Sequence, residues 1–220
     1  MEFPQGKHPP TQFSIIPFSV QKKTGRDLRE TLEQQGLALV LRKVEESTTP
    51  RDDQVFLQNL LENILDHPKD SLTFDRNPWG KPFLRDSPDP QLQFNISHSG
   101  GLTLFGFSRM GELGVDVEEI TLRKDPDRLV RRFYSPAEQE YYFSRDPSER
   151  NLLFHTLWTR KEAVVKAMGR GLGLGLSTFS VVPLGEEKFT LQHRETGDTH
   201  QFWLRSLVLP EGYSGAVALH

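Results

Sequence analysis

The segment "GVDVEEI" places two carboxylates, Asp116 and Glu118, at alternate positions of a predicted β-strand. Alternate side chains of a strand share one face, so the two carboxylates would lie together while Val115 and Val117 face the core. Neighbouring carboxylates repel each other unless a cation lies between them or one of them takes up a proton. Mg²⁺ is commonly bound by one or two carboxylates together with substrate phosphates. The pattern therefore indicates either a metal site or a solvated strand face, and by itself it favours the solvated face.

The segment "WTRKEAVVKAMGRG", which begins at Trp158, has the composition of a helix that ends in glycines. With about 3.6 residues per turn, Trp158, Glu162 and Lys166 would lie on one face. Glu162 would then offer a third oxygen ligand to a metal held by Asp116 and Glu118, and Lys166 would lie beside a metal-bound phosphate. The alternative is an exposed Glu–Lys pair one helical turn apart, which the segment alone favours.

Two turn segments offer contacts for an anion. In "FNISHSGG", Ser97 and His98 come at the end of a predicted strand, where a hydroxyl, an imidazole and backbone N–H groups suit a phosphate. A Ser/His hydrolase is poorly supported, because no G-x-S-x-G motif is present and adjacent residues point apart in a strand. In "GKPF", Lys81 and Pro82 form a turn whose lysine would hold a phosphate. The first segment is equally compatible with a plain hairpin turn, and the second by itself favours one.

The elements that would position these residues alternate between strands and helices. The first part of the chain predicts a strand at 13–20, with Pro17 indicating a sheet edge or a bulge, and a helix at 51–68 with Val55 in its apolar stripe. A three-stranded meander is predicted at 91–120, because glycine-containing turns separate three apolar runs.

The second part of the chain repeats this alternation. A basic helix is predicted within 121–134, and a capping box of Ser135 and Glu138 begins the next helix. Four closing strands follow the helix of the "WTRKEA" segment, the first of them at 177–184. The order predicts an α+β fold of two α+β halves, residues 1–113 and 114–220, each with helices packed on a small antiparallel sheet.

The composition excludes several classes of protein. The chain has 220 residues and a net charge of −3, whereas a non-specific nucleic-acid binder would carry a basic excess. No run of about 18 apolar residues and no signal-peptide core are present, so neither a membrane span nor a leader is expected. The chain has no cysteine, which excludes disulfides, thiolate metal ligands and cysteine catalysis. A soluble cytoplasmic protein is predicted.

The ordered motifs "GKP", "FNISHSGG", "GVDVEE", "FYSPAEQEYY" and "WTRKEAVVKAMGRGL" together resemble the 4'-phosphopantetheinyl transferases of the surfactin (Sfp) type, in their W-KEA form, over residues 79–175. The resemblance implies Mg²⁺-dependent transfer of the 4'-phosphopantetheine arm of coenzyme A to a serine of an apo acyl or peptidyl carrier protein. Adenosine 3',5'-bisphosphate is released, and Mn²⁺ is an alternative metal. The implied fold is a pseudo-dimer of two similar α+β halves with coenzyme A in the cleft between them, so a monomer is expected.

The resemblance also implies roles for the residues of the second half. Asp116, Glu118 and Glu162 match the metal-binding carboxylates of the family. Glu162 also matches the base that takes the proton of the carrier serine, and Lys166 matches the lysine that contacts the diphosphate and assists the leaving group. Trp158 would brace the helix.

The coenzyme A contacts implied by the resemblance come from the first half and from Lys166. Ser97 and His98 match phosphate contacts, and Lys81 and Pro82 match the turn that lines the nucleotide pocket. The family usually has an arginine-rich helix before this turn, but the equivalent segment "QVFLQNLLENIL" has no basic residue. The cations for the 3'-phosphate are therefore unassigned, and the candidates are Lys22, Lys23 and Arg26.

A basic segment is a candidate surface for the carrier. Residues 121–134 contain five basic and two acidic side chains in an otherwise acidic chain. Arg128, Arg131 and Arg132 would cluster on one side of a helix and steer an acidic partner, or they would form an ordinary solvated face.

Two other classes of function stay open at this point. One is a non-catalytic module of the same fold that binds a carrier or a nucleotide, and the other is a different Mg²⁺-dependent phosphotransferase or hydrolase. The complete set of carboxylates and lysine argues against the first, and the missing P-loop argues against a nucleoside triphosphatase. The sequence does not specify which carrier or pathway is served, or whether acylated coenzyme A is accepted.

Overall fold

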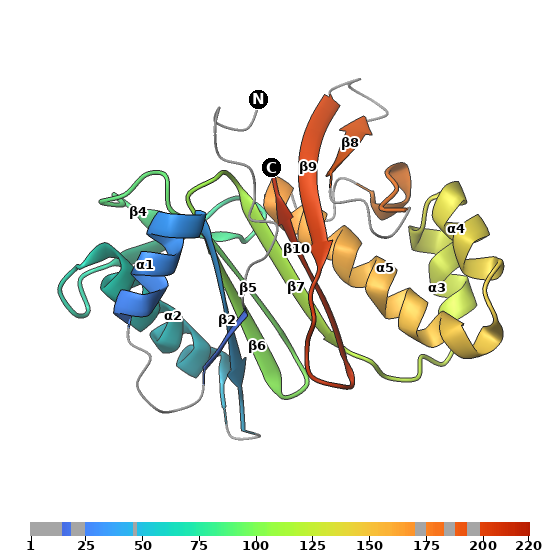
Figure 1. The fold of residues 1–220 in the computed structure, drawn as a ribbon, viewed down its shortest axis with the longest axis horizontal. Helices are drawn as coiled ribbons and strands as arrows, with labels where there is room; N and C mark the ends of the chain where they lie inside the picture. The colour runs from blue at the N-terminus through green and yellow to red at the C-terminus, as the bar shows by residue number, and fades with distance from the viewer. Residues whose placement is uncertain (1–14, 19–24, 46–47, 170–174, 183–187, 193–198) are drawn as a thin grey trace.

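Two four-stranded sheets lie at the centre of the protein, and helices cover the outer face of each (Figure 1). The computed structural model describes residues 15–18, 25–45, 48–169, 175–182, 188–192 and 199–220. The predicted α+β class is confirmed, with antiparallel pairing in both sheets. No helix among the described residues is long and apolar enough to cross a bilayer.

The first sheet has the strand order β1-β2-β6-β5. Its strands are β1 (Ile15–Phe18), β2 (Leu37–Lys43), β6 (Leu102–Ser108) and β5 (Gln93–Ser99). Helices α1 (Gly25–Gln35) and α2 (Pro50–Leu65) cover it, and a separate ribbon of β3 (Thr73–Arg76) and β4 (Pro82–Arg85) carries the "NPWGK" turn. Strand β1 pairs with β2 in parallel at the sheet edge, where Pro17 was predicted to lie.

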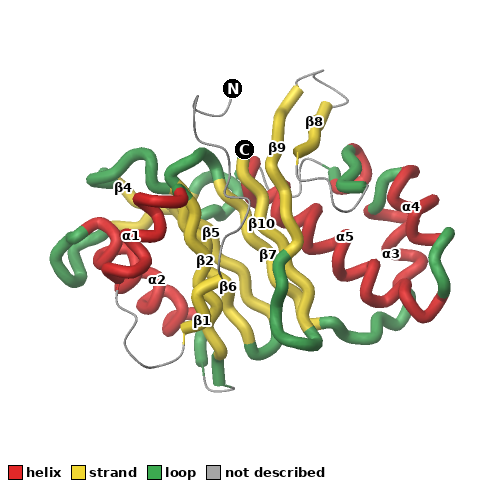
Figure 2. The backbone as a smooth tube through the Cα atoms, viewed as in Figure 1, coloured by secondary structure: helices red, strands yellow, loops and turns green. Residues whose placement is uncertain are grey.

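The second sheet has the strand order β7-β10-β9-β8 and is antiparallel throughout. Its strands are β7 (Leu113–Glu119), β10 (Tyr213–Leu219), β9 (Thr199–Ser206) and β8 (Lys188–Gln192). Helix α5 (Pro147–Met168) packs on its outer face, and α3 (Pro126–Phe133) and α4 (Pro136–Phe143) pack against the far side of α5, as Figure 2 shows.

The two sheets repeat one topology. In the first, the strand before the long helix, β2, pairs with the last strand of the half, β6, which pairs with β5. In the second, β7 pairs with β10, which pairs with β9. The last strand of the first sheet ends at Ser108, and the first strand of the second sheet begins at Leu113. The division of the chain into halves between residues 113 and 114 remains our proposal.

Three apolar clusters hold these layers together. Two of them lie between each sheet and its own helices. The third lies between the sheets and joins side chains such as Leu39, Leu104 and Val117. This inner cluster fixes the two halves against each other and so fixes the position of any site formed between them.

Three local predictions were wrong. Val55 is 52% exposed, because the buried stripe of α2 runs through Leu57, Leu61 and Ile64 and Val55 lies on the opposite side of the helix. The described part of 177–184 contains a short 3₁₀ helix (Leu176–Thr178) and no strand. The prediction of a three-stranded meander was also wrong, because β5 and β6 pair in the first sheet whereas β7 belongs to the second.

Candidate active site

A close approach of α5 to β7 creates the centre of the site. A β-carbon on Gly114 would lie 1.9 Å from the carbonyl oxygen of Ala163 and 2.4 Å from the amide nitrogen of Ala167. Only glycine permits this contact between a helix backbone and a strand. Because alternate residues of β7 share a face, the same contact places the helical turn of Glu162 and Lys166 over the two carboxylates of "GVDVE". Gly114 is a functional position that our sequence reasoning missed.

A buried ion pair fixes α5 on its other side. Lys161 and Glu138 are both 0% exposed, and the lysine Nζ donates to the two carboxylate oxygens at 2.8 and 2.6 Å. Nζ also donates to the carbonyl oxygen of Phe179 at 2.7 Å, and Glu138 accepts from the amide of Val181 at 2.8 Å. Glu138 closes the predicted capping box with Ser135, so one carboxylate connects α4, α5 and the segment of Phe179 and Val181.

Asp116 is 4% exposed and holds Lys166. Its Oδ1 accepts hydrogen bonds from Lys166 Nζ at 2.7 Å and from Ser97 Oγ at 2.8 Å. Its Oδ2 is buried and has no hydrogen-bond partner among the described residues. Burial raises the pKa of Asp116, and the ammonium of Lys166 opposes that rise.

Glu162 shares this environment. Burial, followed by the negative charges of Asp116 and Glu118, raises the pKa of Glu162 to about 7, and Lys166 opposes that rise. A carboxyl with a pKa near neutrality suits a general base, because it is partly ionised at neutral pH and more basic than an ordinary carboxylate. The structure therefore pairs Lys166 with Asp116, and it places Glu162 and Glu118 near enough for their charges to act on the same carboxylates.

The donors at this position fit a divalent cation that is completed by its substrate. Among the described residues, no three Asp, Glu, His or Cys side chains form a ready-made metal site. Mg²⁺ does not need one, since it often uses one or two carboxylates plus substrate phosphates. The partnerless Oδ2 of Asp116 and the raised pKa of Glu162 both indicate too little positive charge around the carboxylates. A cation bound here would supply that charge.

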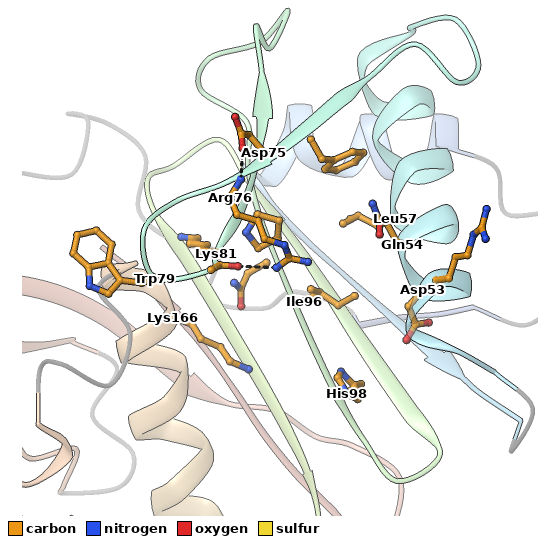
Figure 3. Close-up of a pocket in the computed structure, with 15 residues that line it drawn as sticks. Asp53, Gln54, Leu57, Asp75, Arg76, Trp79, Lys81, Ile96, His98 and Lys166 are labelled. Carbon is orange, nitrogen blue, oxygen red and sulfur yellow. Dashed lines mark hydrogen bonds between the residues drawn. The ribbon is translucent and has the colours of Figure 1, made fainter.

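A cavity of about 1040 Å³ lies beside Lys166, which is the member of this group that lines it. It is lined by the "NPWGK" turn, by α2 and by β5, and Lys166 reaches it from α5 (Figure 3). Lys81, Pro82 and His98, for which coenzyme A contacts were predicted, line it. Asn77 connects the turn to the end of α5 by donating to the carbonyl oxygen of Gly169 at 2.9 Å.

Two residues that were predicted to contact coenzyme A already form hydrogen bonds within the protein. Lys81 Nζ donates to Glu112 at 2.7 Å and to the carbonyl oxygen of Leu113 at 3.2 Å, so it joins the turn to the start of β7. Ser97 does not line the cavity. It is 6% exposed and faces Asp116.

Arg51 and Arg76 also line the cavity and were not predicted. The lining carboxylates are already neutralised, since Asp53 pairs with Arg42 at 2.9 Å and Asp75 pairs with Arg85 at 2.7 Å. Arg76 donates to the carbonyl oxygen of Gly80 at 2.8 Å. Within the described part of the chain neither Arg51 nor Arg76 has an ion-pair partner, and Figure 3 shows Arg76 pointing into the cavity.

The signal for these two arginines was weak in the sequence. Arg76 precedes the GKP turn by only a few residues, and Arg51 opens the helix that otherwise has no basic side chain. Lys22 and Lys23, which were considered for the same role, lie outside the described residues, as does the side chain of Arg26.

The basic helix α3 lies on the far side of α5 from the first half (Figure 1). Arg128, Arg131 and Arg132 are exposed, as predicted. Arg131 stacks over Phe143 at 4.5 Å and Arg132 over Phe133 at 5.0 Å, which holds both guanidinium groups at the surface.

A carboxylate with a partnerless buried oxygen, a lysine paired with it and a cavity lined by cations are groups that metal-assisted transfer of a phosphate-bearing group can use. Comparison with known proteins agrees with that class. The family model "4'-phosphopantetheinyl transferase superfamily" matches residues 112–218, and "4'-phosphopantetheinyl transferase, N-terminal" matches residues 52–107. The chain belongs to the 4'-phosphopantetheinyl transferase superfamily, and its relatives include proteins of the Sfp type.

Two relatives illustrate the similarity. The Synechocystis sp. protein slr0495, which bears the name of a 4'-phosphopantetheinyl transferase, is 37% identical over 164 residues, or 71% of this chain and 65% of its own. The 4'-phosphopantetheinyl transferase Sfp of Bacillus subtilis is 31% identical over 153 residues, or 68% of this chain and 63% of its own. The chain thus spans less than two thirds of the length of either relative. Holo-[acyl-carrier-protein] synthase of Thermotoga maritima aligns at 18% identity over 49% of this chain and 61% of its own, with a TM-score of 0.33, a likeness too distant to support an inference.

Proposed function

We propose that the protein transfers the 4'-phosphopantetheine arm of coenzyme A to a serine of an apo acyl or peptidyl carrier protein and releases adenosine 3',5'-bisphosphate. One observation supports this most directly: Asp116, whose buried Oδ2 has no partner among the described residues, pairs with Lys166. Lys166 in turn lines a cavity with two arginines that have no ion-pair partner among the described residues. A non-catalytic binding module would not need this set of carboxylates.

The reaction forms one oxygen–phosphorus bond and breaks another. The carrier serine Oγ attacks the phosphorus next to the pantetheine, and the bond from that phosphorus to the adenosine-bearing phosphate breaks. Glu162 takes the serine proton, since its surroundings without metal raise its pKa to about 7 and make it more basic than an exposed carboxylate. Lys166 offsets the charge that develops on the leaving phosphate. Asp116, Glu118 and Glu162 would hold Mg²⁺ or Mn²⁺, which supplies charge neutralisation of the diphosphate when bound.

Coenzyme A would occupy the cavity beside these groups. His98, Lys81 and Pro82 line it together with Lys166, and a group with several phosphates matches its unpaired cations. We assign the 3'-phosphate to Arg51 and Arg76, because a guanidinium without a carboxylate partner is free to form a bidentate pair with phosphate.

The carrier would approach over α3. Charge reversal at Arg128 and Arg132 should raise the carrier KM while leaving the coenzyme A KM unchanged, because exposed charges act mainly on encounter with a charged partner. Unchanged carrier kinetics would remove this surface from the proposal. We further propose that the protein acts as a monomer, since one chain supplies both halves, and that it is cytoplasmic, as its composition predicts.

A mass measurement tests the function. The protein is incubated with coenzyme A, Mg²⁺ and an apo carrier, and the intact carrier is weighed. A gain equal to one phosphopantetheine arm, absent with EDTA, supports the transferase. Carrier binding without a gain indicates a binding module, and phosphate release without carrier modification indicates a hydrolase. Fatty-acid, polyketide and peptide carriers compared in parallel would show which class is served.

A further inference from the structure

Strands β5 and β7 meet at the junction of the two sheets without pairing through their backbones. Side chains of β5 instead accept hydrogen bonds from amides of β7. The three pairs are Val115 to Asn95 Oδ1, Val117 to Ser97 Oγ, and Glu119 to Ser99 Oγ, at 2.9, 3.3 and 3.0 Å. Each pair is separated by 20 residues, so the two strands run in parallel with one fixed register. A polar side-chain ladder thus replaces the backbone ladder between the halves.

The two serines of this ladder repeat a second contact. Ser97 donates its hydroxyl to Asp116 Oδ1 at 2.8 Å, and Ser99 donates to Glu118 Oε2 at 3.1 Å. Each serine therefore accepts from an amide of β7 and donates to the carboxylate of the preceding residue. Because a hydroxyl has one hydrogen, acceptance from the amide leaves that hydrogen for the carboxylate.

Ser97 has no capacity left for a further ligand. Its two acceptor positions are taken by the amide of Val117 at 3.3 Å and by Lys166 Nζ at 2.9 Å, and its hydrogen goes to Asp116. These contacts direct Oδ1 of Asp116 toward Ser97 and Lys166. The other oxygen, Oδ2, is the one left buried without a partner.

We propose that Ser97 and Ser99 are positioning residues, which orient Asp116 and Glu118 so that their remaining oxygens face a divalent cation. This inference rests on the proposed function. It gives Ser97 a different role from the predicted coenzyme A contact, for which its hydroxyl is neither free nor exposed to the cavity. Partners that orient metal ligands are worth roughly 10- to 100-fold in metal affinity or activity.

The test measures metal binding apart from turnover. Mn²⁺ is titrated into the full chain with coenzyme A and without a carrier, and free Mn²⁺ is followed by electron paramagnetic resonance. Ser97→Ala and Ser99→Ala should each weaken Mn²⁺ binding by about 10- to 100-fold. Ser99→Thr, which keeps the hydroxyl at a half-buried position, should retain wild-type affinity.

A matched control separates this role from loss of a buried hydroxyl. Ser108 is also buried and also accepts a backbone amide, from Met110 at 3.0 Å, but the structure gives its hydroxyl no carboxylate partner. Ser108→Ala should therefore leave Mn²⁺ affinity within about twofold, since its hydroxyl orients no metal ligand. Should Ser97→Ala not fold, Ser99→Ala still tests the pattern, because Ser99 is only half-buried.

Steady-state kinetics with a carrier complete the test. For Ser97→Ala, raised Mn²⁺ should restore kcat, and the coenzyme A KM at saturating Mn²⁺ should equal that of the wild type. Unchanged Mn²⁺ affinity in both alanine variants would overturn the inference, as would a raised coenzyme A KM at saturating metal. Carrier modification by the wild type is measured separately. Its absence would contradict the proposed function, whereas unchanged Mn²⁺ affinity in the serine variants would contradict only their positioning role.

Discussion

Replacement of Gly114 by alanine should separate α5 from β7. The added β-carbon would lie 1.9 Å from the carbonyl oxygen of Ala163, where ordinary contact begins at 3.4 Å, so the helix must move by about 1.5 Å. The obstructing atoms belong to the helix backbone and cannot rotate away. The helix also carries Glu162 and Lys166, and the moved turn would no longer meet Asp116.

Two magnitudes follow from this displacement. Overpacking of a filled core costs about 1 to 3 kcal/mol of folding free energy. Misplacement of catalytic groups by about 1 Å can reduce a rate on the order of 100-fold. We therefore expect Gly114→Ala to lose about 1 to 3 kcal/mol of stability and at least about 100-fold in kcat, with a smaller effect on the coenzyme A KM because the cavity is built mainly from the first half.

Urea unfolding and carrier-modification kinetics measure the two effects. Gly101→Ala is the matched control, because a β-carbon there would meet its nearest neighbour, the hydroxyl of Tyr213, at 3.6 Å, an ordinary contact. That variant should change stability by no more than about 0.5 kcal/mol beyond the intrinsic effect of the substitution. If Gly114→Ala kept wild-type stability and kcat, the close approach of α5 would not be what positions the site.

Three further predictions concern other parts of the site. The kcat/KM of the wild type should rise with pH, because Glu162, whose pKa is about 7 without metal, must lose its proton to act as base, and higher Mg²⁺ should move the rise to lower pH. Glu162→Gln should abolish the rise and reduce the rate by about 100- to 10,000-fold; a flat wild-type profile at every Mg²⁺ concentration would contradict this role. Lys161→Met should cost about 3 to 5 kcal/mol in urea unfolding, since it leaves the carboxylate of Glu138 buried without its cation; a loss below 1 kcal/mol would show that the pair is dispensable. Arg76→Ala should raise the KM for coenzyme A but not for 3'-dephospho-coenzyme A, whereas Arg29→Ala, which removes a cation of α1 that does not line the cavity, should affect neither; equal effects on both substrates would show that Arg76 does not bind the 3'-phosphate.

The sequence by itself determined the features that depend on neighbouring residues. The capping box of Ser135 and Glu138 forms as predicted, because its partners lie three positions apart. Gly169 ends α5 in the left-handed conformation that its glycine run indicated. Strand periodicity correctly placed Val115 and Val117 in the core, opposite the two carboxylates of β7. The expected roles in metal binding, catalysis and coenzyme A binding came from the resemblance to family motifs.

Only the tertiary structure decided which distant side chains meet. Lys166 reaches Asp116 across 50 residues of chain because Gly114 admits the backbone of α5. Ser97 faces the same carboxylate because side chains, and not backbone groups, set the register between β5 and β7. Arg76 enters the cavity as a free cation because Asp75 is already paired with Arg85. Each of these facts depends on how the two sheets pack, and no spacing within a single segment contains that information.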